Sequence, residues 1–277
     1  MTTGMDWQDA VGRTWAQMYQ QTDRSFSGLT DHLLGRIAAH PGANVLDVGC
    51  GAGELSLAVA RARPKARGIG LDVSADLIAA ARLRAGERSN LRFVDGDGAS
   101  WSDASFAPDL LVSRHGVMFF ADPPAAFAHL RAMATPQAHM VFSCFRSPRE
   151  NPWASELAEI AGLSPGDPTM PGPFAFADPQ RVEAILSEGG WGRIDFEPFD
   201  FAYVAGKGAD PVEDAFAFFT RIGPAAAALR ERDGAERAVL EERLRTVLET
   251  HRDGDMVVFA AAAWIVTAHA DRRFRSR

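Results

Sequence analysis

The stretch that decides the fold is residues 45–53, which read Val-Leu-Asp-Val-Gly-Cys-Gly-Ala-Gly. Its first four residues predict the end of a short buried strand, its glycines predict a turn, and the apolar spacing of residues 55–62 predicts a helix. Glycines in such a turn let the backbone approach a ligand that any side chain would block. A strand, a glycine-rich turn and a helix in this order indicate a nucleotide-binding α/β fold.

Strands and helices alternate outward from this turn. Strands are expected at 44–48, 66–71, 91–94, 109–113, 139–145, 194–203 and 256–268. Helices are expected at 5–22, 29–39, 55–62, 75–85, 123–133, 153–161 and 178–189, and within 210–250. The alternation predicts a Rossmann-like, doubly wound α/β fold with a mostly parallel seven-stranded sheet. The N-terminal helices and a helical, aromatic insertion are expected to form a lid over the site.

The chain divides into five parts by pattern. We expect an N-terminal helical lid over 1–42 and the Rossmann-like core over 43–145. Substrate-side loops, a helix and a sheet strand follow over 146–209, then a helical cap over 210–253. A final core strand and a basic tail complete the sequence over 254–277.

Composition excludes several classes of protein. The 277 residues are 47% hydrophobic, a share too high for a disordered chain. The net charge of −7 is too acidic for a general nucleic-acid binder. Two cysteines, Cys50 and Cys144, cannot form a disulfide framework. No signal peptide is visible, and the longest apolar run, 256–266, is too short for a membrane helix. We expect a cytoplasmic protein without nucleic-acid or membrane partners, as a monomer or homodimer.

The glycine turn does not fit the two best-known phosphate-binding patterns. A dinucleotide fingerprint would need Gly or Ala where Glu54 or Ser56 stands, and the Lys of a Walker loop is absent. The pattern acid-x-Gly-x-Gly-x-Gly instead resembles motif I of class I S-adenosylmethionine-dependent methyltransferases, within the ubiquinone/menaquinone-biosynthesis-like group of small-molecule enzymes. The resemblance extends in order and spacing over about 43–145.

The resemblance implies how a cofactor would be held. Asp47 would face the ammonium of S-adenosyl-L-methionine, Asp72 its ribose, and Asp97 its adenine amino group. A carboxylate at position 47 would repel a dinucleotide's phosphates, whereas this cofactor has none. The cofactor-binding residues expected are Asp47, Gly49, Cys50, Gly51, Gly53, Asp72, Val73, Asp97, Gly98, Ala99, Ser113, Arg114, Trp15 and Arg24.

The substrate-facing segment of the family corresponds to residues 113–120. His115 is the candidate base for a hydroxyl or amine, and the alternative is that it only packs or hydrogen-bonds beside the cofactor. Arg114 would orient a substrate carboxylate or pair with one of the acids. The substrate-binding residues expected are Tyr19, His115, Met118, Phe119, Trp153, Phe174 and Phe176, although a packed core would use many of the same aromatic residues.

The resemblance predicts methyl transfer by in-line displacement, with S-adenosyl-L-homocysteine as product and no metal required. The acceptor expected is a small or medium organic molecule, methylated on a hydroxyl, phenol or carboxylate oxygen in preference to nitrogen or carbon. A peptide or natural-product carboxylate is the alternative acceptor. Rivals of another class are a nicotinamide-dependent oxidoreductase and a non-catalytic cofactor-binding protein. Residues 135–138 and 100–102 depart from the family pattern, which weakens transfer of a quinone-ring substrate.

Overall fold

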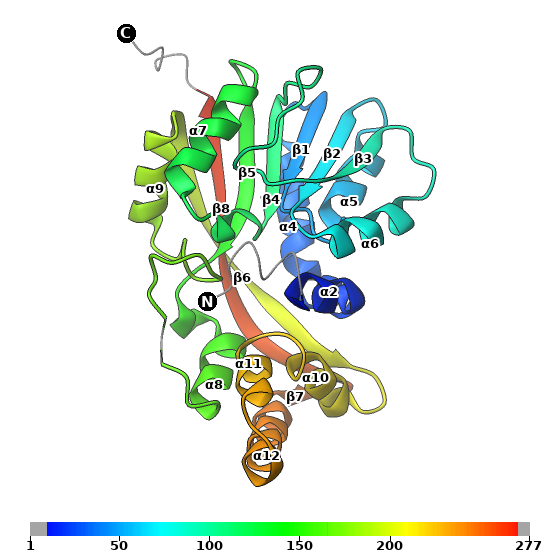
Figure 1. The fold of residues 1–277 in the computed structure, drawn as a ribbon, viewed down its shortest axis with the longest axis vertical. Helices are drawn as coiled ribbons and strands as arrows, with labels where there is room; N and C mark the ends of the chain where they lie inside the picture. Colours follow the sequence, from blue (N-terminus) through cyan, green and yellow to red (C-terminus); the bar gives the residue numbers. More distant parts are fainter. Residues whose placement is uncertain (1–9, 165, 271–277) are drawn as a thin grey trace.

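The computed structural model describes residues 10–164 and 166–270 and is built on one mixed sheet (Figure 1). Its strands are β1 Asn44–Val48, β2 Arg67–Asp72, β3 Leu91–Asp95, β4 Leu110–Arg114, β5 His139–Phe145, β6 Trp191–Lys207, β7 Arg252–Asp253 and β8 Met256–Ala270. The sheet order is β3-β2-β1-β4-β5-β8-β6, with β7 paired to β8 off this path. The first five strands are parallel, whereas β8 runs antiparallel to both β5 and β6. This architecture confirms the predicted Rossmann-like fold.

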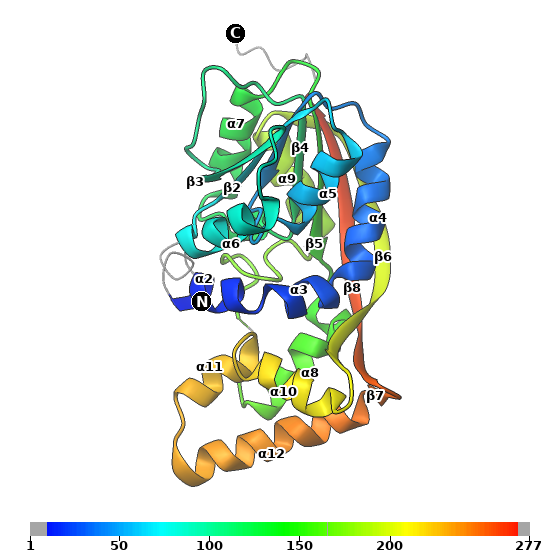
Figure 2. The ribbon, with the colours of Figure 1, turned by 90° about the vertical axis from the view of Figure 1, so that its right-hand side faces the viewer.

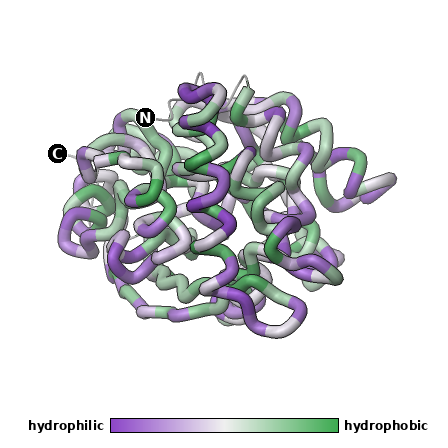
Figure 3. The backbone as a smooth tube through the Cα atoms, turned by 90° about the horizontal axis from the view of Figure 1, so that it is seen from below, coloured by the Kyte–Doolittle hydropathy of each residue, from purple (hydrophilic) through white to green (hydrophobic). Residues whose placement is uncertain are grey.

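Helices flank the sheet and continue beyond it. The α-helices are α2 Ala10–Gln17, α3 Tyr19–Ser25, α4 Ser27–Ala38, α5 Glu54–Ala62, α6 Ala75–Ala85, α7 Pro123–Met133, α8 Pro152–Ile160, α9 Pro179–Glu188, α10 Pro211–Phe219, α11 Pro224–Arg230 and α12 Gly234–Thr250. Two short 3-10 helices, η1 Val117–Phe119 and η2 Pro148–Glu150, follow β4 and β5. The tube in Figure 3 alternates in hydropathy along the surface helices, as expected for helices that bury one face. None of the described helices is both long and apolar enough to cross a bilayer.

Strands β6 and β8 form a long antiparallel pair that extends beyond the rest of the sheet. We call this pair the hairpin, although α10, α11, α12 and β7 connect its two strands. They pair from Trp191 and Ala270 at one end to Lys207 and Met256 at the other. Helices α8, α10, α11 and α12 gather around the far end of this hairpin (Figures 1 and 2). Helices α2 and α3 run across the middle of the molecule, between those helices and the sheet (Figure 2).

Three expected elements differ in extent. The expected helix 5–22 is two helices, α2 and α3, separated at Met18, and residues 1–9 lie outside the described part. Strand β6 is longer than the expected 194–203, because its first half lies at the sheet edge with alternating exposure and no apolar run. The segment 210–250 is three separate helices, α10, α11 and α12. The basic residues of 271–277 lie outside the described residues.

Candidate functional site

The glycine turn lies between β1 and α5, at the edge where the parallel strands end. Gly49, Gly51 and Gly53 all have positive φ angles, of 67°, 55° and 85°. At Gly49 a side chain is excluded twice over, because a Cβ atom there would lie 2.7 Å from the Cα atom of Gly116. The loops that follow β1 and β4 therefore touch backbone to backbone, at the point where the chain order of the sheet reverses. Ligands of open α/β sheets bind at such points.

Asp72 ends β2 and holds the glycine turn in place. Its carboxylate accepts hydrogen bonds from the backbone N–H groups of Gly51 at 2.8 Å and of Ser74 at 2.9 Å. Burial raises the pKa of this carboxyl, and the two backbone hydrogen bonds oppose that shift. Val73 stands between Asp72 and Ser74 in the chain. The lone pairs that remain on Asp72 are acceptors beside the turn.

Asp97 follows β3 and is exposed at the same edge. One of its carboxylate oxygens accepts a hydrogen bond from the N–H group of Ala99 at 2.8 Å. Gly98 is buried between them, and a Cβ atom on it would lie 2.9 Å from a methyl group of Val48. The structure therefore brings Asp97, Gly98 and Ala99 to the edge that holds Asp72 and the glycine turn.

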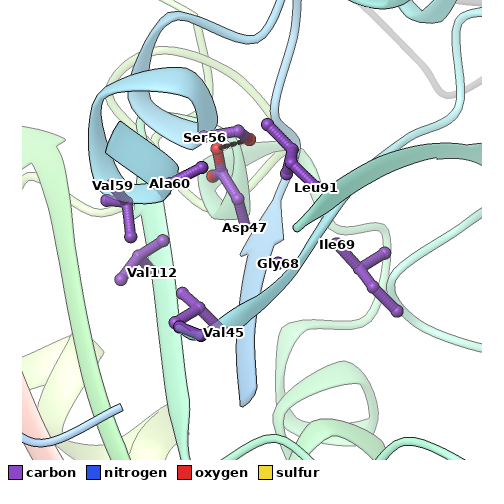
Figure 4. A pocket seen from close by; sticks show the side chains of 10 residues that line it. Val45, Asp47, Ser56, Val59, Ala60, Gly68, Ile69, Leu91 and Val112 are labelled. Atoms are coloured by element: carbon purple, nitrogen blue, oxygen red, sulfur yellow. Dashed lines mark hydrogen bonds between the residues drawn. The ribbon is translucent and has the colours of Figure 1, made fainter. Parts of the chain in front are cut away.

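Asp47 is placed differently, underneath the turn. Its carboxylate lies below the first turn of α5, where it accepts a 2.5 Å hydrogen bond from the Ser56 hydroxyl (Figure 4). The other oxygen, Oδ1, has no hydrogen-bond partner among the described residues. Burial raises the pKa of Asp47 to about 7, although Ser56 and Arg114 oppose the shift. Asp47 also lines a cavity of about 10 Å³, which is the size of one water molecule. Cys50, in the turn above, is buried.

Ser113 joins the ends of β4 and β1. Its hydroxyl donates to the carbonyl of Val48 at 2.7 Å and accepts from the N–H group of Gly116 at 3.1 Å. These two bonds satisfy a buried hydroxyl and fix the backbone on both sides of His115. That Ser113 lies against the cofactor stays a prediction. Its two hydrogen bonds shape the region between the loops that follow β1 and β4, which we call the crevice.

His115 follows β4 with an unusual backbone and an unusual environment. Its φ angle is +62°, which is uncommon for a residue with a side chain and often marks a functional position. The imidazole stacks on Phe145 at 4.0 Å between ring centroids and meets the edge of Phe26 at 5.3 Å. Neither ring nitrogen has a hydrogen-bond partner within the described part of the chain. Burial, together with the nearby charge of Arg114, lowers the pKa of His115 to about 3. The ring is therefore neutral at pH 7.

Arg114 is engaged by acidic residues from two helices. Its guanidinium pairs with Glu54 at the start of α5, donates to the Thr30 hydroxyl at 2.7 Å, and lies 3.7 Å from Asp23. The acids that Arg114 approaches are Glu54 and Asp23, and its role toward a substrate carboxylate stays a prediction. Burial raises the pKa of Glu54, and the charge of Arg114 opposes that shift.

An aromatic wall lies beside His115, and we define it as Phe145, Trp153, Phe174 and Tyr203. The Trp153 and Tyr203 rings stack at 5.0 Å with an interplanar angle of 7°, and Phe145 lies 5.0 Å from Trp153 and 5.9 Å from Phe174. Two of the expected substrate residues, Trp153 and Phe174, are therefore near His115. Trp153, Phe145 and Tyr203 are buried in the same core cluster as Phe176, whereas Phe174 is partly exposed. The wall combines β5, α8, the loop between α8 and α9, and β6.

Two expected site residues, Arg24 and Phe176, lie elsewhere. Arg24 donates to the carbonyls of Val204 and Ala205 and pairs with Asp214, so its guanidinium joins α3 to the hairpin rather than to the glycine turn. Phe176 is fully buried against Phe127 and Phe142, which makes it a core residue.

Met118 is likewise buried in the core, whereas Phe119 and Trp15 are partly buried and pack against the same cluster. Tyr19 lies under the guanidinium of Arg84, at 4.4 Å from ring centroid to carbon. Core packing, the alternative left open for these apolar residues, accounts for Met118 and Phe176.

Sequence reasoning missed three residues that shape the site: Phe26, Arg84 and Asn151. Asn151 is completely buried, and its side chain bonds the backbone of Ala262 in both directions while accepting from the Trp153 indole at 3.1 Å. It thereby fixes Trp153 against β8. An Asn directly before a helix-starting proline is the one local signal that marked it.

No group of three metal-ligating side chains in residues 10–164 and 166–270 is placed to hold an ion. Three histidines, His40, His139 and His269, do gather at the opposite edge of the sheet, near where β5 begins. Their ring centroids lie 4.4–5.9 Å apart, with the rings packed on one another. This cluster is separate from the crevice.

Several known proteins are similar to this chain. A protein family described as a methyltransferase domain matches residues 18–173, more than half of the chain. Trans-aconitate 2-methyltransferase of Deinococcus radiodurans is 36% identical over 118 residues, which are 42% of this chain and 44% of that protein. Malonyl-acyl-carrier-protein O-methyltransferase of Xylella fastidiosa is 31% identical over 101 residues, 36% of this chain and 34% of that protein. The chain thus spans less than half the length of these two curated relatives.

Among solved structures, the YcgJ protein of Bacillus subtilis is similar with a TM-score of 0.58. The superposition covers 87% of this chain and 99% of that one at 18% sequence identity. At this identity the likeness concerns the fold alone.

Proposed function

This chain belongs to the family of methyltransferase domains, and on that premise we propose that it transfers a methyl group from S-adenosyl-L-methionine to a carboxylate oxygen of an organic acid. Fold and family together place it among the class I small-molecule methyltransferases. The observation that carries the choice of acceptor is the state of His115. It stands where a base would stand, and it is buried, unpartnered and neutral.

The residues of the crevice fit the cofactor. The ligand has hydroxyl, amino and ammonium donors and no phosphate, and the crevice edge offers the carboxylate acceptors of Asp72 and Asp97 together with a turn that has no side chains. Asp72 would hold the ribose, and the Gly98–Ala99 backbone with Asp97 would hold the adenine. Asp47 would act from below the turn on the methionine end.

When bound, S-adenosyl-L-methionine supplies an electrophilic methyl group on a positively charged sulfur and leaves as S-adenosyl-L-homocysteine. A hydroxyl or phenol acceptor would have to lose a proton to attack. Proton transfer from a phenol, with a pKa of about 10, to this imidazole is unfavourable, because burial lowers the pKa of His115 to about 3. A carboxylic acid is already ionised at pH 7, so its oxygen attacks without a base.

His115 then orients the acceptor. A neutral imidazole has one N–H donor, which can hold one carboxylate oxygen while the other faces the methyl group. The positive charge of the sulfur disfavours protonation of the ring further. The body of the acid would lie against Phe174, the partly exposed member of the aromatic wall, and the wall would exclude water from the reacting atoms.

The two curated relatives support the same chemistry. Both are named for acceptors that are carboxylic acids, trans-aconitate and malonyl-acyl carrier protein. Their matched segments cover less than half of each protein, so the acceptor itself is inferred from His115 and the wall.

The test is turnover on a matched acceptor panel. Purified protein would receive S-adenosyl-L-methionine with di- and tricarboxylic acids, aryl carboxylic acids, a short peptide, phenols and amines, with S-adenosyl-L-homocysteine and methyl ester measured by mass spectrometry. We expect esters from acids, with a rate that changes little between pH 6 and 8. Faster transfer to a phenol or amine than to every acid would overturn the proposal.

Two variants of His115 test its role. Asn and Gly both tolerate the positive φ angle, so neither adds backbone strain. We expect His115→Asn, which keeps an N–H donor, to retain most of the turnover, and His115→Gly to lose roughly 10- to 100-fold in kcat. His129→Asn on α7 is the control. Equal turnover in both His115 variants and the wild type would show that His115 only packs.

A further inference from the structure

We infer that Arg84 is a positioning residue for the cofactor, which holds the apex of the glycine turn and ties the N-terminal helices to it. The inference rests on the proposed function, since it concerns binding of S-adenosyl-L-methionine. Arg84 stands near the end of α6, and nothing in its local sequence marks it. Its guanidinium reaches two segments that are far from it in the chain, the glycine turn and α3.

The first contact is with the turn. Arg84 Nη1 donates to the carbonyl of Ala52 at 2.8 Å. Ala52 stands between Gly51 and Gly53, both of which have positive φ angles. The N–H group of Gly51 is bound on the other side by Asp72 at 2.8 Å. The turn is therefore held from β2 by a carboxylate and from α6 by a guanidinium, which reduces the ordering that a ligand would otherwise impose.

The second and third contacts are with the N-terminal helices. Arg84 Nη2 lies 2.7 Å from Asp23 Oδ2, and the guanidinium carbon lies 4.4 Å from the centroid of the Tyr19 ring. Both residues belong to α3. The side chains of Arg84 and Asp23 are only 21% and 19% exposed, so solvent screens this pair less than a surface ion pair.

Asp23 extends the connection across the crevice. Its second oxygen, Oδ1, lies 3.7 Å from Arg114, which in turn pairs with Glu54 at the start of α5. One carboxylate of α3 therefore links α6, which follows β2, to the end of β4. Figure 2 shows α2 and α3 running below α6 at this level. A ligand on the glycine turn would be enclosed by this arrangement, and it would leave when the arrangement opens.

A matched control stands two residues earlier on the same helix. Arg82 also donates to a backbone carbonyl, that of Phe93, through Nε at 3.2 Å and Nη2 at 2.9 Å. Within the described residues the hydrogen bonds of its guanidinium go to Phe93 and not to the turn or to α3. Removing Arg82 and removing Arg84 each take a guanidinium from α6, but only Arg84 acts on the crevice.

The experiment compares Arg84→Met with Arg82→Met, since Met keeps the apolar stem. Affinities for S-adenosyl-L-methionine and S-adenosyl-L-homocysteine would be measured by calorimetry, dissociation by stopped flow, and turnover at saturating cofactor. For Arg84→Met we expect affinity about tenfold weaker, faster dissociation and a kcat within twofold. For Arg82→Met we expect affinity within twofold of the wild type. Asp23→Asn should weaken affinity like Arg84→Met, and the double variant should lose less than the product of the two effects.

The outcomes separate the inference from its premise. If the wild type binds the cofactor and Arg84→Met binds it as well as Arg82→Met does, Arg84 has no positioning role. A lower kcat in Arg84→Met with unchanged cofactor affinity would also overturn the inference, because the loss would then concern the chemical step. If the wild type binds neither form of the cofactor, the proposed function itself fails.

Discussion

The cofactor edge and the aromatic wall are neighbours in the molecule but are built in opposite ways. At the cofactor edge, short chain segments after β1, β2 and β3 present backbone groups and carboxylates, and most contacts join residues less than 25 positions apart. At the wall, Trp153 stacks on Tyr203, fifty positions away, and Phe26 meets His115 from the N-terminal helices.

The difference shows that cofactor recognition and acceptor recognition depend on different kinds of contact. Recognition of one fixed cofactor can be encoded in a turn and three strand ends, because the sheet brings those ends together. Recognition of an acceptor depends on how α8, the hairpin and the N-terminal helices pack, and hence on many unconnected residues. We expect the two sides to respond separately to substitution.

The largest effect is expected beneath the turn, at Asp47. Its folded-state carboxyl keeps its proton up to about pH 7, whereas the unfolded chain loses that proton near pH 4. Because the unfolded state then binds fewer protons, stability falls as pH rises through this window. Asp47→Asn should match the wild type near pH 4 and exceed its unfolding free energy by about 4 kcal/mol at pH 8. Denaturant unfolding at both pH values measures this, and a pH-independent difference would contradict it.

Asp72→Ala should separate the cofactor edge from the wall. The substitution removes the charge-assisted hydrogen bonds from Gly51 in the turn and from Ser74, as well as the ribose acceptor, so we expect cofactor affinity to fall about a hundredfold. Calorimetry with S-adenosyl-L-homocysteine measures it. Asp76→Ala, on exposed α6 surface, is the control. Unchanged affinity in Asp72→Ala would remove this residue from the site.

Trp153→Leu should show the reverse pattern. Loss of the Tyr203 stack is expected to raise the KM for the acceptor about tenfold and to leave cofactor affinity within twofold. Phe176→Leu is the control, because it also removes a buried ring, but one that packs against Phe127 and Phe142. A similar rise in KM for both variants would mean that general loosening, and not the wall, governs acceptor binding.

The smallest effect is expected at the histidine cluster, away from both sides. Burial lowers the pKa of His40, and His139, His269, Arg36 and Arg63 add to the shift. The unfolded chain therefore takes up more protons than the folded one as pH falls below about 6.5, and stability declines. His40→Gln should decline less between pH 6.5 and 5 in denaturant titrations, with cofactor affinity unchanged at pH 7. An unchanged pH slope would show that His40 titrates normally.

Residues 43–145 were predictable because each feature there is local. A glycine turn between a strand and a helix, and an acid at the end of each following strand, can be recognised without knowing the rest of the fold. The break at Met18 could not be recognised, because α3 is placed by packing against β6. The length of β6 could not be recognised either, because its first half lies at the sheet edge without an apolar run. Asn151 carries no pattern of its own.

The N-terminal segment shows the limit most clearly. Sequence reasoning selected Arg24 for the cofactor, yet the neighbouring residue Asp23 is the one turned toward the crevice. Consecutive residues on a helix point about 100° apart, so an error of one position changes the partner entirely. Arg24 bonds Val204 and Ala205 instead, and Arg84 supplies a guanidinium at the turn.

The hairpin of β6 and β8 has a consequence for how this molecule comes apart. Its strands are 17 and 15 residues long, and each has one end among the parallel strands and the other among α8, α10 and α12. Because β8 is hydrogen-bonded to β5 over residues 139–145 and to β6 along most of its length, the cofactor edge and the acceptor side share one continuous sheet. Melting should accordingly be a single event, and chimeras that exchange acceptor specificity will succeed by replacing side chains along this shared ribbon rather than by grafting a detachable module.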